Sequence, residues 1–240
     1  MEDNLSSTSA IENLDKVIRK EIDHPNSIID AERICSSLEK FAPGKELLDI
    51  GAGYGFFSNA AQNKGFNVTA IELNENSRNV FRQMTGFDAL NVPFDENFAQ
   101  RFFQKFDVVL LSQVLEHIPM QANPIKNLHS LIRPNGICVV AVPHYRSMVS
   151  ILQGKRDMFI TPPEHLNFFT IKGLKVAFVK NGFENIMTET ISRYDTGKIC
   201  SRINNQLFGR ALAKLILLVL KAPDLFNKGM IINSYFRKKS

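Results

Sequence analysis

Residues 47–57, LLDIGAGYGFF, decide the fold of this 240-residue chain. The apolar run before Gly51 indicates a buried strand, and glycines then occupy every second position through Gly55. Because glycine has no Cβ, the backbone N–H groups of such a turn can point at a ligand that approaches the chain closely. The stretch therefore predicts a strand that ends at a ligand-binding turn.

Segments with the pattern of strands alternate with helical patterns on either side of this turn. Strands are expected at residues 46–50, 66–73, 87–93, 106–112, 137–143, 183–192 and 229–238, and helices at 54–64, 75–85, 123–136 and 170–181. Strands joined by helix-length connections are typical of an open, mostly parallel sheet with helices on both faces. The predicted fold class is therefore α/β and doubly wound, with ligands bound beyond the carboxyl ends of the strands.

The residues around the glycines restrict the class of ligand. A phosphate-binding P-loop needs a Lys-Ser/Thr pair after its last glycine, where this chain has Phe56 and Phe57. A dinucleotide-binding turn needs a small residue at position 56, so Phe56 disfavours it. Asp49 lies just before the turn, where its carboxylate would repel a pyrophosphate and can help to hold a cation.

Glu72 lies 21 residues after Gly51, at the end of the second expected strand. A carboxylate in that place can accept hydrogen bonds from both hydroxyls of a ribose, although it can equally be an ordinary acid at a strand end. Together with Asp49, it favours a nucleoside that carries positive charge and no phosphate. S-adenosylmethionine has this chemistry.

Four motifs in the same order resemble those of the class I S-adenosylmethionine-dependent methyltransferases: LLDIGAGYGFF, VTAIEL, FDVVLLSQVLEHI and LIRPNGICVVAVP. The resemblance covers residues 42–191. It is closest to the subgroup with LEH after the fourth strand and a late PPEHLNFFT, found among small-molecule, quinone-pathway and glycan methyltransferases. It implies a Rossmann-like, seven-stranded sheet in which the last strand, at 229–238, is antiparallel to the others.

The resemblance also implies a cofactor site for S-adenosylmethionine at the strand ends. The turn would face the methionine end, the end of the second strand the ribose, the third strand the adenine and the fourth strand the methyl-donor sulfur. These residues are Asp49, Gly51, Ala52, Gly53, Glu72, Leu73, Asn91, Ser112 and Gln113. Asn91 departs from the family, whose members often have an acid near that position.

Three histidines near the strand ends are candidate catalytic bases: His117, His144 and His165. A histidine of ordinary pKa near ~6.5 suits proton removal from an alcohol or a phenol, and each of the three can instead be a capping or packing residue. Glu116 and His117 suggest a metal pair, but adjacent residues on a helix seldom project into one site. Nothing else in the sequence completes a ligand set, so no metal is predicted.

The chain is expected to form one methyltransferase domain at residues 41–240, preceded by a helical segment at 1–40. Within the domain, residues 145–169 exceed an ordinary loop and are expected to cover the substrate. A helical insert is expected at 201–228, before the last strand. Its core, residues 207–226, is amphipathic, and the continuous apolar run within it is too short to span a bilayer. It is therefore expected to dock on its own domain or to lie peripherally on a membrane.

Composition and charge indicate a cytoplasmic protein. Three cysteines without metal-ligand spacing argue against a disulfide framework or a zinc site, and the acidic, polar start does not have the pattern of a secretory signal. Residues 1–40 hold five Lys/Arg against nine Asp/Glu, whereas residues 193–240 hold ten against two. This asymmetry indicates either a solvated basic face or an anionic partner such as the inner face of a membrane. Nucleic acid is disfavoured, because no basic groove carries interleaved aromatic residues.

The predicted function is transfer of the methyl group of S-adenosylmethionine to a small-molecule, glycan or lipid-linked acceptor, with oxygen favoured over nitrogen. Two alternatives remain at the level of sequence. One is a non-catalytic module that binds the cofactor or a membrane, and the other is an NAD-dependent oxidoreductase. No pattern in the sequence indicates the oligomeric state.

Overall fold

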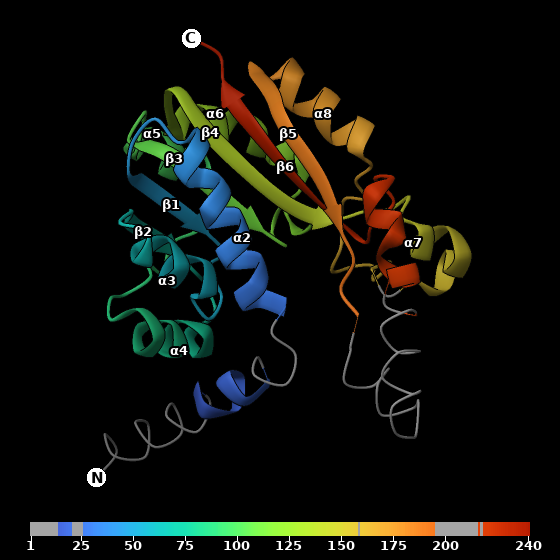
Figure 1. Ribbon diagram of the computed structural model, residues 1–240. Helices are drawn as coiled ribbons and strands as arrows, with labels where there is room; N and C mark the ends of the chain where they lie inside the picture. Colours follow the sequence, from blue (N-terminus) through green and yellow to red (C-terminus); the bar gives the residue numbers. More distant parts are fainter. Residues whose placement is uncertain (1–13, 21–25, 158, 195–215, 217) are drawn as a thin grey trace.

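A computed structural model describes residues 14–20, 26–157, 159–194, 216 and 218–240, and Figure 1 shows their arrangement. A central sheet of six strands has the order β2-β1-β3-β4-β6-β5. Neighbouring strands are parallel except at β6, which is antiparallel to β4 and to β5. The strands are β1 (Glu46–Ile50), β2 (Asn67–Ile71), β3 (Phe106–Ser112), β4 (Ile132–Pro143), β5 (Phe183–Ile191) and β6 (Ile231–Lys238).

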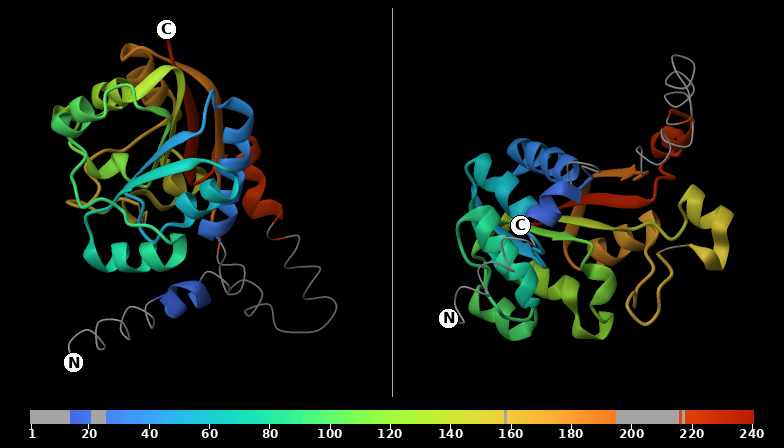
Figure 2. Two further views of the ribbon diagram at one scale, coloured as in Figure 1. Left: turned by 90° about the vertical axis from the view of Figure 1, so that its left-hand side faces the viewer. Right: turned by 90° about the horizontal axis from the view of Figure 1, so that it is seen from below.

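Helices cover both faces of this sheet (Figures 1 and 2). They are α2 (Asn26–Phe41), α3 (Phe56–Asn63), α4 (Glu75–Thr85), α5 (Glu96–Arg101), α6 (Pro124–Leu131), α7 (Met148–Gln153) and α8 (Ile171–Lys180). Short 3-10 turns are η1 (Leu115–His117), η2 (Met120–Ala122) and η3 (Gly154–Arg156). The predicted doubly wound α/β fold is confirmed.

Alternate residues of the central strands supply two separate cores. On β3, Val108 and Leu110 pack with α2 and α3, whereas Val109 and Leu111 pack with the side of the sheet that carries α5, α6 and α8. All four are fully buried. A strand covered on both faces has no polar side to present, which is why FDVVLLS reads as an almost continuous apolar run.

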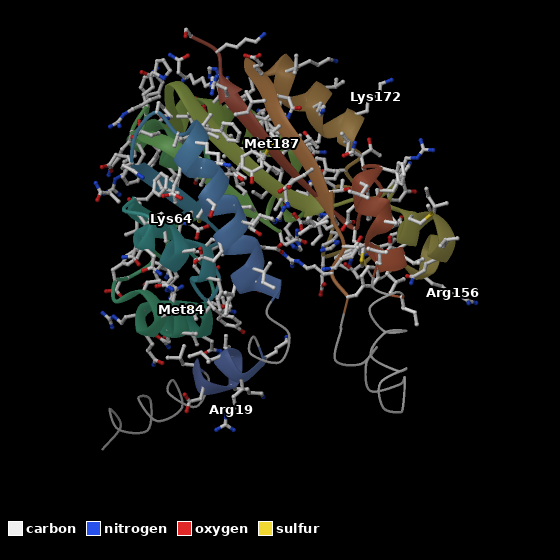
Figure 3. All side chains as sticks on the ribbon, in the orientation of Figure 1. Arg19, Lys64, Met84, Arg156, Lys172 and Met187 are labelled. Carbon is white, nitrogen blue, oxygen red and sulfur yellow. The ribbon has the colours of Figure 1, made fainter. Side chains whose placement is uncertain are left out.

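The helices that flank the glycine turn are fixed by local signals. Asn74 begins α4 by accepting a hydrogen bond from the Ser77 amide at 3.0 Å, and Gly86 ends it in the left-handed conformation. Lys64, labelled in Figure 3, follows α3 and forms an ion pair with Glu39 of α2 at 3.3 Å. The ion pair joins α3 to α2 near the amino ends of β1 and β2, while the Asn74 cap begins α4 just beyond the carboxyl end of β2.

The expected seventh strand is absent from the described residues. Of residues 87–93, only Leu90 pairs with the sheet, through an isolated parallel bridge to Ile71. Leu90 lies beside an edge strand and is 39% exposed, so little burial favours a longer ladder. Pro93, which has no amide hydrogen, prevents the pairing from continuing there. The prediction of seven strands is therefore wrong for this chain, while the antiparallel final strand is confirmed.

The predicted insert at 201–228 lies mostly outside the described residues. Of its described residues, 218–225 are helical, and Leu218, Val219 and Leu225 are exposed. No helix in the described part of the chain is both long and apolar enough to cross a membrane.

Candidate cofactor and acceptor site

The turn after β1 depends on glycine at three positions. Gly51, Gly53 and Gly55 have φ values of +68°, +55° and +91°, in the left-handed region that other residues rarely adopt. A Cβ on Gly51 would lie 2.5 Å from Val114 Cγ2, whereas a Cβ on Gly53 would meet no atom within 4 Å. Gly51 thus allows the loop after β3 to approach the turn, and Gly53 leaves its backbone open to a ligand.

Glu72 connects the glycine turn to the start of α4. Its Oε2 accepts a hydrogen bond from the Gly53 amide at 2.9 Å, and its Oε1 accepts one from the Asn74 amide at 2.8 Å. A carboxylate has about four lone-pair sites, so each oxygen can still accept a hydroxyl donor. Glu72 therefore shapes the turn itself and keeps capacity for a ligand.

Asp49 is a buried carboxyl group directly below the turn. It is 2% exposed, and its Oδ2 accepts a hydrogen bond from Ser58 Oγ at 2.7 Å. The pKa of Asp49 is raised from 3.8 to about 6, mainly by burial; the Ser58 hydrogen bond opposes the shift and the nearby charge of Glu72 adds to it. A positively charged ligand would favour the ionised form.

A cavity of about 810 Å³ opens beside this turn. Of the sequence-predicted cofactor residues, it is lined by Asp49, Gly51, Ala52, Gly53, Ser112 and Gln113. Gln113 has φ +57°, and its amide donates to the Ala141 carbonyl at 2.8 Å, which fixes the end of β3 against β4. The volume lies within the ~300–1,000 Å³ typical of small-molecule sites.

Three predicted cofactor residues do not line this cavity. Glu72 acts through the turn as described, Leu73 is 61% exposed, and Asn91 is exposed beyond the isolated bridge of Leu90. For Asn91 the reason is that the third strand did not form. Its side chain is consequently not held by the sheet at the mouth of the cavity.

The cavity also includes residues that the motifs did not indicate. Lys16, Val17 and Lys20 come from the helical segment 14–20, and Arg193 comes from the chain after β5. Ser27, Asn76 and Val80 lie outside the motifs as well, whereas Tyr54, Phe56 and Phe57, which complete the lining, belong to the glycine motif. Arg193 donates through Nε to Asp30 Oδ2 of α2 at 2.7 Å. No local pattern reveals these contacts, because segments far apart in the sequence meet only in the folded chain.

The three candidate histidines occupy two different environments. His144 is 4% exposed, and its Nδ1 lies 3.0 Å from the Gly229 carbonyl oxygen. Burial lowers the pKa of His144, and it does not line the large cavity. It holds the end of β4 against the start of β6, which is a structural position.

His117 and His165 lie together beyond the end of β3. Their rings are in edge contact with centroids 4.8 Å apart. Glu116, which shares the η1 turn with His117, lies beside them. One potential ligand atom from each of these three residues lies within 4.8 Å of the others. Burial raises the pKa of Glu116 to about 7. The prediction of no metal assumed that Glu116 and His117 lie on a regular helix and that no third ligand is near. In the structure they lie on the 3-10 turn η1, and His165 lies beside them.

Comparison with known proteins gives one family. Residues 28–188 match the family model described as a methyltransferase domain. A ubiquinone biosynthesis O-methyltransferase from Actinobacillus pleuropneumoniae serotype 7 (strain AP76) is 25% identical over 169 residues, which cover 61% of this chain and 72% of the relative.

Solved structures show the same fold. A SAM-dependent methyltransferase from Archaeoglobus fulgidus has a TM-score of 0.60 at 16% identity, over 87% of this chain and 94% of the other. Magnesium protoporphyrin IX methyltransferase from Synechocystis PCC 6803, with bound SAH, has a TM-score of 0.57 at 14% identity, over 91% of this chain and 86% of the other.

Proposed function

Because the chain belongs to the class I S-adenosylmethionine-dependent methyltransferases, we propose that it methylates an oxygen atom of a small organic acceptor. Methyl transfer from S-adenosylmethionine is the activity of the family, and NAD-dependent oxidation is set aside on that ground. An oxygen acceptor is supported by the ubiquinone biosynthesis O-methyltransferases among the relatives.

One observation carries the assignment of the site: the glycine turn and the end of β3 line the same cavity. Asp49 and Gly53 at the turn line it together with Ser112 and Gln113 at the end of β3. The buried Asp49 carboxylate fits the ammonium or sulfonium charge of the cofactor, and the open backbone at Gly53 fits a close approach. The residues present are therefore compatible with the cofactor.

When bound, S-adenosylmethionine supplies a methyl group already activated by its sulfonium sulfur. The protein then needs to hold the acceptor oxygen in line with that methyl group and to exclude water. Residues 145–169, which contain α7 and η3, extend from β4 as a separate lobe at the carboxyl ends of the strands (Figures 1 and 2). We assign this lobe the role of covering the acceptor.

An acceptor hydroxyl also benefits from a group that removes or weakens its proton. All three candidate histidines place Nδ1 near a backbone carbonyl oxygen. His117 is exposed and His165 is half-buried, whereas His144 is buried, so the first two are better placed to reach an acceptor. His165 additionally lines a small cavity with Tyr145 and Phe168. These two aromatic residues can contact the apolar body of an acceptor.

The proposal is tested by incubating the purified chain with isotopically labelled S-adenosylmethionine and extracts of metabolites, lipids and glycans, followed by mass spectrometry. We expect a labelled product whose methyl group is on oxygen and one equivalent of S-adenosylhomocysteine per product. Labelled products only on nitrogen or carbon would overturn the assignment of an oxygen acceptor.

The role of Glu72 is tested separately with a matched pair of variants at one turn. Glu72→Ala removes the acceptor of the Gly53 and Asn74 amides, and we expect weaker binding of S-adenosylhomocysteine. Asn74→Ala removes only the helix cap, at a cost of about 1 kcal/mol of stability, and we expect unchanged binding. Equal affinities for both variants would contradict a role of Glu72 at the cofactor.

A further inference from the structure

We propose that Glu116, His117 and His165 form a binding site for one divalent transition-metal cation, of the class that includes Zn²⁺ and Fe²⁺. It is the one group of this kind among the described residues, with potential ligand atoms within 4.8 Å of one another. Imidazole nitrogen and carboxylate oxygen bind zinc at ~2.0–2.2 Å, so the three side chains would move closer together around a bound cation.

The Glu116 carboxyl group is the observation that points to a ligand. The residue is 0% exposed, and neither Oε1 nor Oε2 has a hydrogen-bond partner among the described residues. Buried polar atoms in native proteins are almost always paired, because an unpaired buried carboxylate is costly. Asp107, also a buried acid, shows the ordinary arrangement: it accepts from the Glu46 amide at 3.0 Å and pairs with Arg133. A cation at Glu116 would supply the missing partner.

Both histidines are oriented as metal ligands usually are. His117 Nδ1 lies 2.8 Å from the Glu164 carbonyl oxygen, and His165 Nδ1 lies 2.7 Å from the Phe159 carbonyl oxygen. A carbonyl oxygen only accepts hydrogen bonds, so each Nδ1 carries the proton. In the neutral ring Nε2 then has a free lone pair. Histidine ligands typically donate their other nitrogen to a carbonyl or a carboxylate in this way.

The backbone around the site is held in place by the segment that contains His165. Asn167 Nδ2 donates to the Ile118 carbonyl at 2.7 Å and to the Leu115 carbonyl at 3.2 Å. The Leu166 amide donates to the Glu116 carbonyl at 2.8 Å. These bonds fix residues 164–167 against η1, so the three side chains are gathered by the fold before any cation binds.

The chemistry of the donors selects the class of cation. Two of the three are imidazole nitrogens, which suit zinc, iron and related transition metals, whereas Mg²⁺ and Ca²⁺ prefer sites made of oxygen. Three protein ligands from two histidines and one glutamate leave a coordination position open, as in catalytic zinc sites. A cavity of about 10 Å³ adjoins His165, which is near the volume needed for one water-sized ligand.

The site lies at the acceptor side of the cofactor cavity. Val114, directly before η1, contacts the turn at Gly51, and Gln113 lines the cavity itself. If the proposed function holds, the open position would take the acceptor oxygen. A hydroxyl bound to the cation releases its proton to solvent more readily, and its electron pair forms the bond to the methyl carbon while the carbon–sulfur pair stays on sulfur.

The test measures metal binding directly, without an acceptor. The full chain is stripped with a chelator and titrated with Zn²⁺, Mn²⁺ and Mg²⁺ by calorimetry, and S-adenosylhomocysteine binding is measured on the same preparations. We expect one Zn²⁺ per chain and weaker binding of Mn²⁺ and Mg²⁺. Glu116→Gln and His165→Gln should each weaken Zn²⁺ binding by more than about tenfold, since even residues that only orient ligands contribute 10–100-fold.

Glu164→Gln is the matched control, because its exposed side chain is next to the cluster but offers it no ligand atom. Zn²⁺ affinity should be unchanged in this variant. The site would be overturned if the wild type does not bind Zn²⁺. It would also be overturned if the wild type, Glu116→Gln and His165→Gln bind Zn²⁺ with equal affinity. If S-adenosylhomocysteine still binds in that case, the methyltransferase assignment stands while the metal proposal fails. Circular dichroism identifies a misfolded variant, and the other variant then gives the comparison.

Discussion

Replacing Gly53 by alanine separates backbone strain from ligand contact at the turn. Gly53 has φ +55°, and Gly65, after α3, has φ +75°; a Cβ at either position would meet no protein atom within 4 Å. The two alanine variants therefore impose the same kind of strain without a clash. Only Gly53 lines the large cavity, where the added methyl group would occupy space meant for the cofactor.

The expected sizes follow from this difference. A left-handed alanine costs about 1–2 kcal/mol, so both variants should lower the melting temperature by about 2–8 °C in a chain of this length. An extra methyl group in a close contact costs about 1–3 kcal/mol, which corresponds to about five- to 150-fold weaker binding. Only Gly53→Ala should show this loss of affinity.

The assay combines thermal unfolding with calorimetric titration of S-adenosylhomocysteine for wild type, Gly53→Ala and Gly65→Ala. Equal loss of stability and unequal loss of affinity supports the assignment of the turn. Wild-type affinity in Gly53→Ala would refute it, because the ligand would not then approach the turn.

Three further predictions concern charge, packing and cysteine reactivity. Burial raises the pKa of Asp49 from 3.8 to about 6, so ionisation of this group destabilises the folded chain. As the pH rises from 3.8 to above 6, the unfolding free energy of the wild type should fall by about 3 kcal/mol relative to that of Asp49→Asn. Urea titrations across this range measure the difference, and identical pH slopes would contradict the assignment. Phe178 is fully buried and stacks on Phe236 at 4.0 Å; Phe178→Ala should cost about 3–5 kcal/mol with little change in S-adenosylhomocysteine affinity, and a loss of both would show that the core and the site are coupled. Burial raises the pKa of Cys35 to about 12 and also raises that of Cys138; mass spectrometry after thiol labelling should find both unmodified in the folded chain and modified in urea, and labelling of either in the native state would argue against its burial.

Elements with strong local signals were predictable from the sequence. The bounds expected for β1, β3 and α4 agree with the structure, because short, almost wholly apolar strands and a helix between Asn74 and Gly86 need no distant contact to be recognised. α5 was not predicted, although Asp95 caps it by accepting from the Phe98 amide at 2.8 Å. Its six residues are too few for a clear helical pattern.

The strand expected at 87–93 shows where the sequence is insufficient. Its pattern permits a strand, but a ladder forms only if a neighbouring edge offers enough burial, and here pairing stops at Leu90.

The part of the site that lies at the strand ends was predictable. Asp49, Gly53 and Gln113 are adjacent to strand ends and meet because parallel strands end at one edge of the sheet.

Residues brought by distant segments could not be read from motifs. Arg193 enters the cavity from the chain after β5, and its position depends on Asp30 of α2. His165 reaches Glu116 and His117 because Asn167 docks residues 164–167 on η1. Such groupings depend on hydrogen bonds between residues that lie 49 or 163 positions apart, which leave no periodic signal in the sequence.

The most direct measurement of the central claim is a crystal structure of the chain with S-adenosylhomocysteine. The account predicts the ligand in the cavity beside Gly53, with its amino-acid end toward Asp49, its ribose at Glu72 and its sulfur toward Gln113. Density for the ligand in another cavity, or a ribose without contact to the Glu72 carboxylate, would contradict the account.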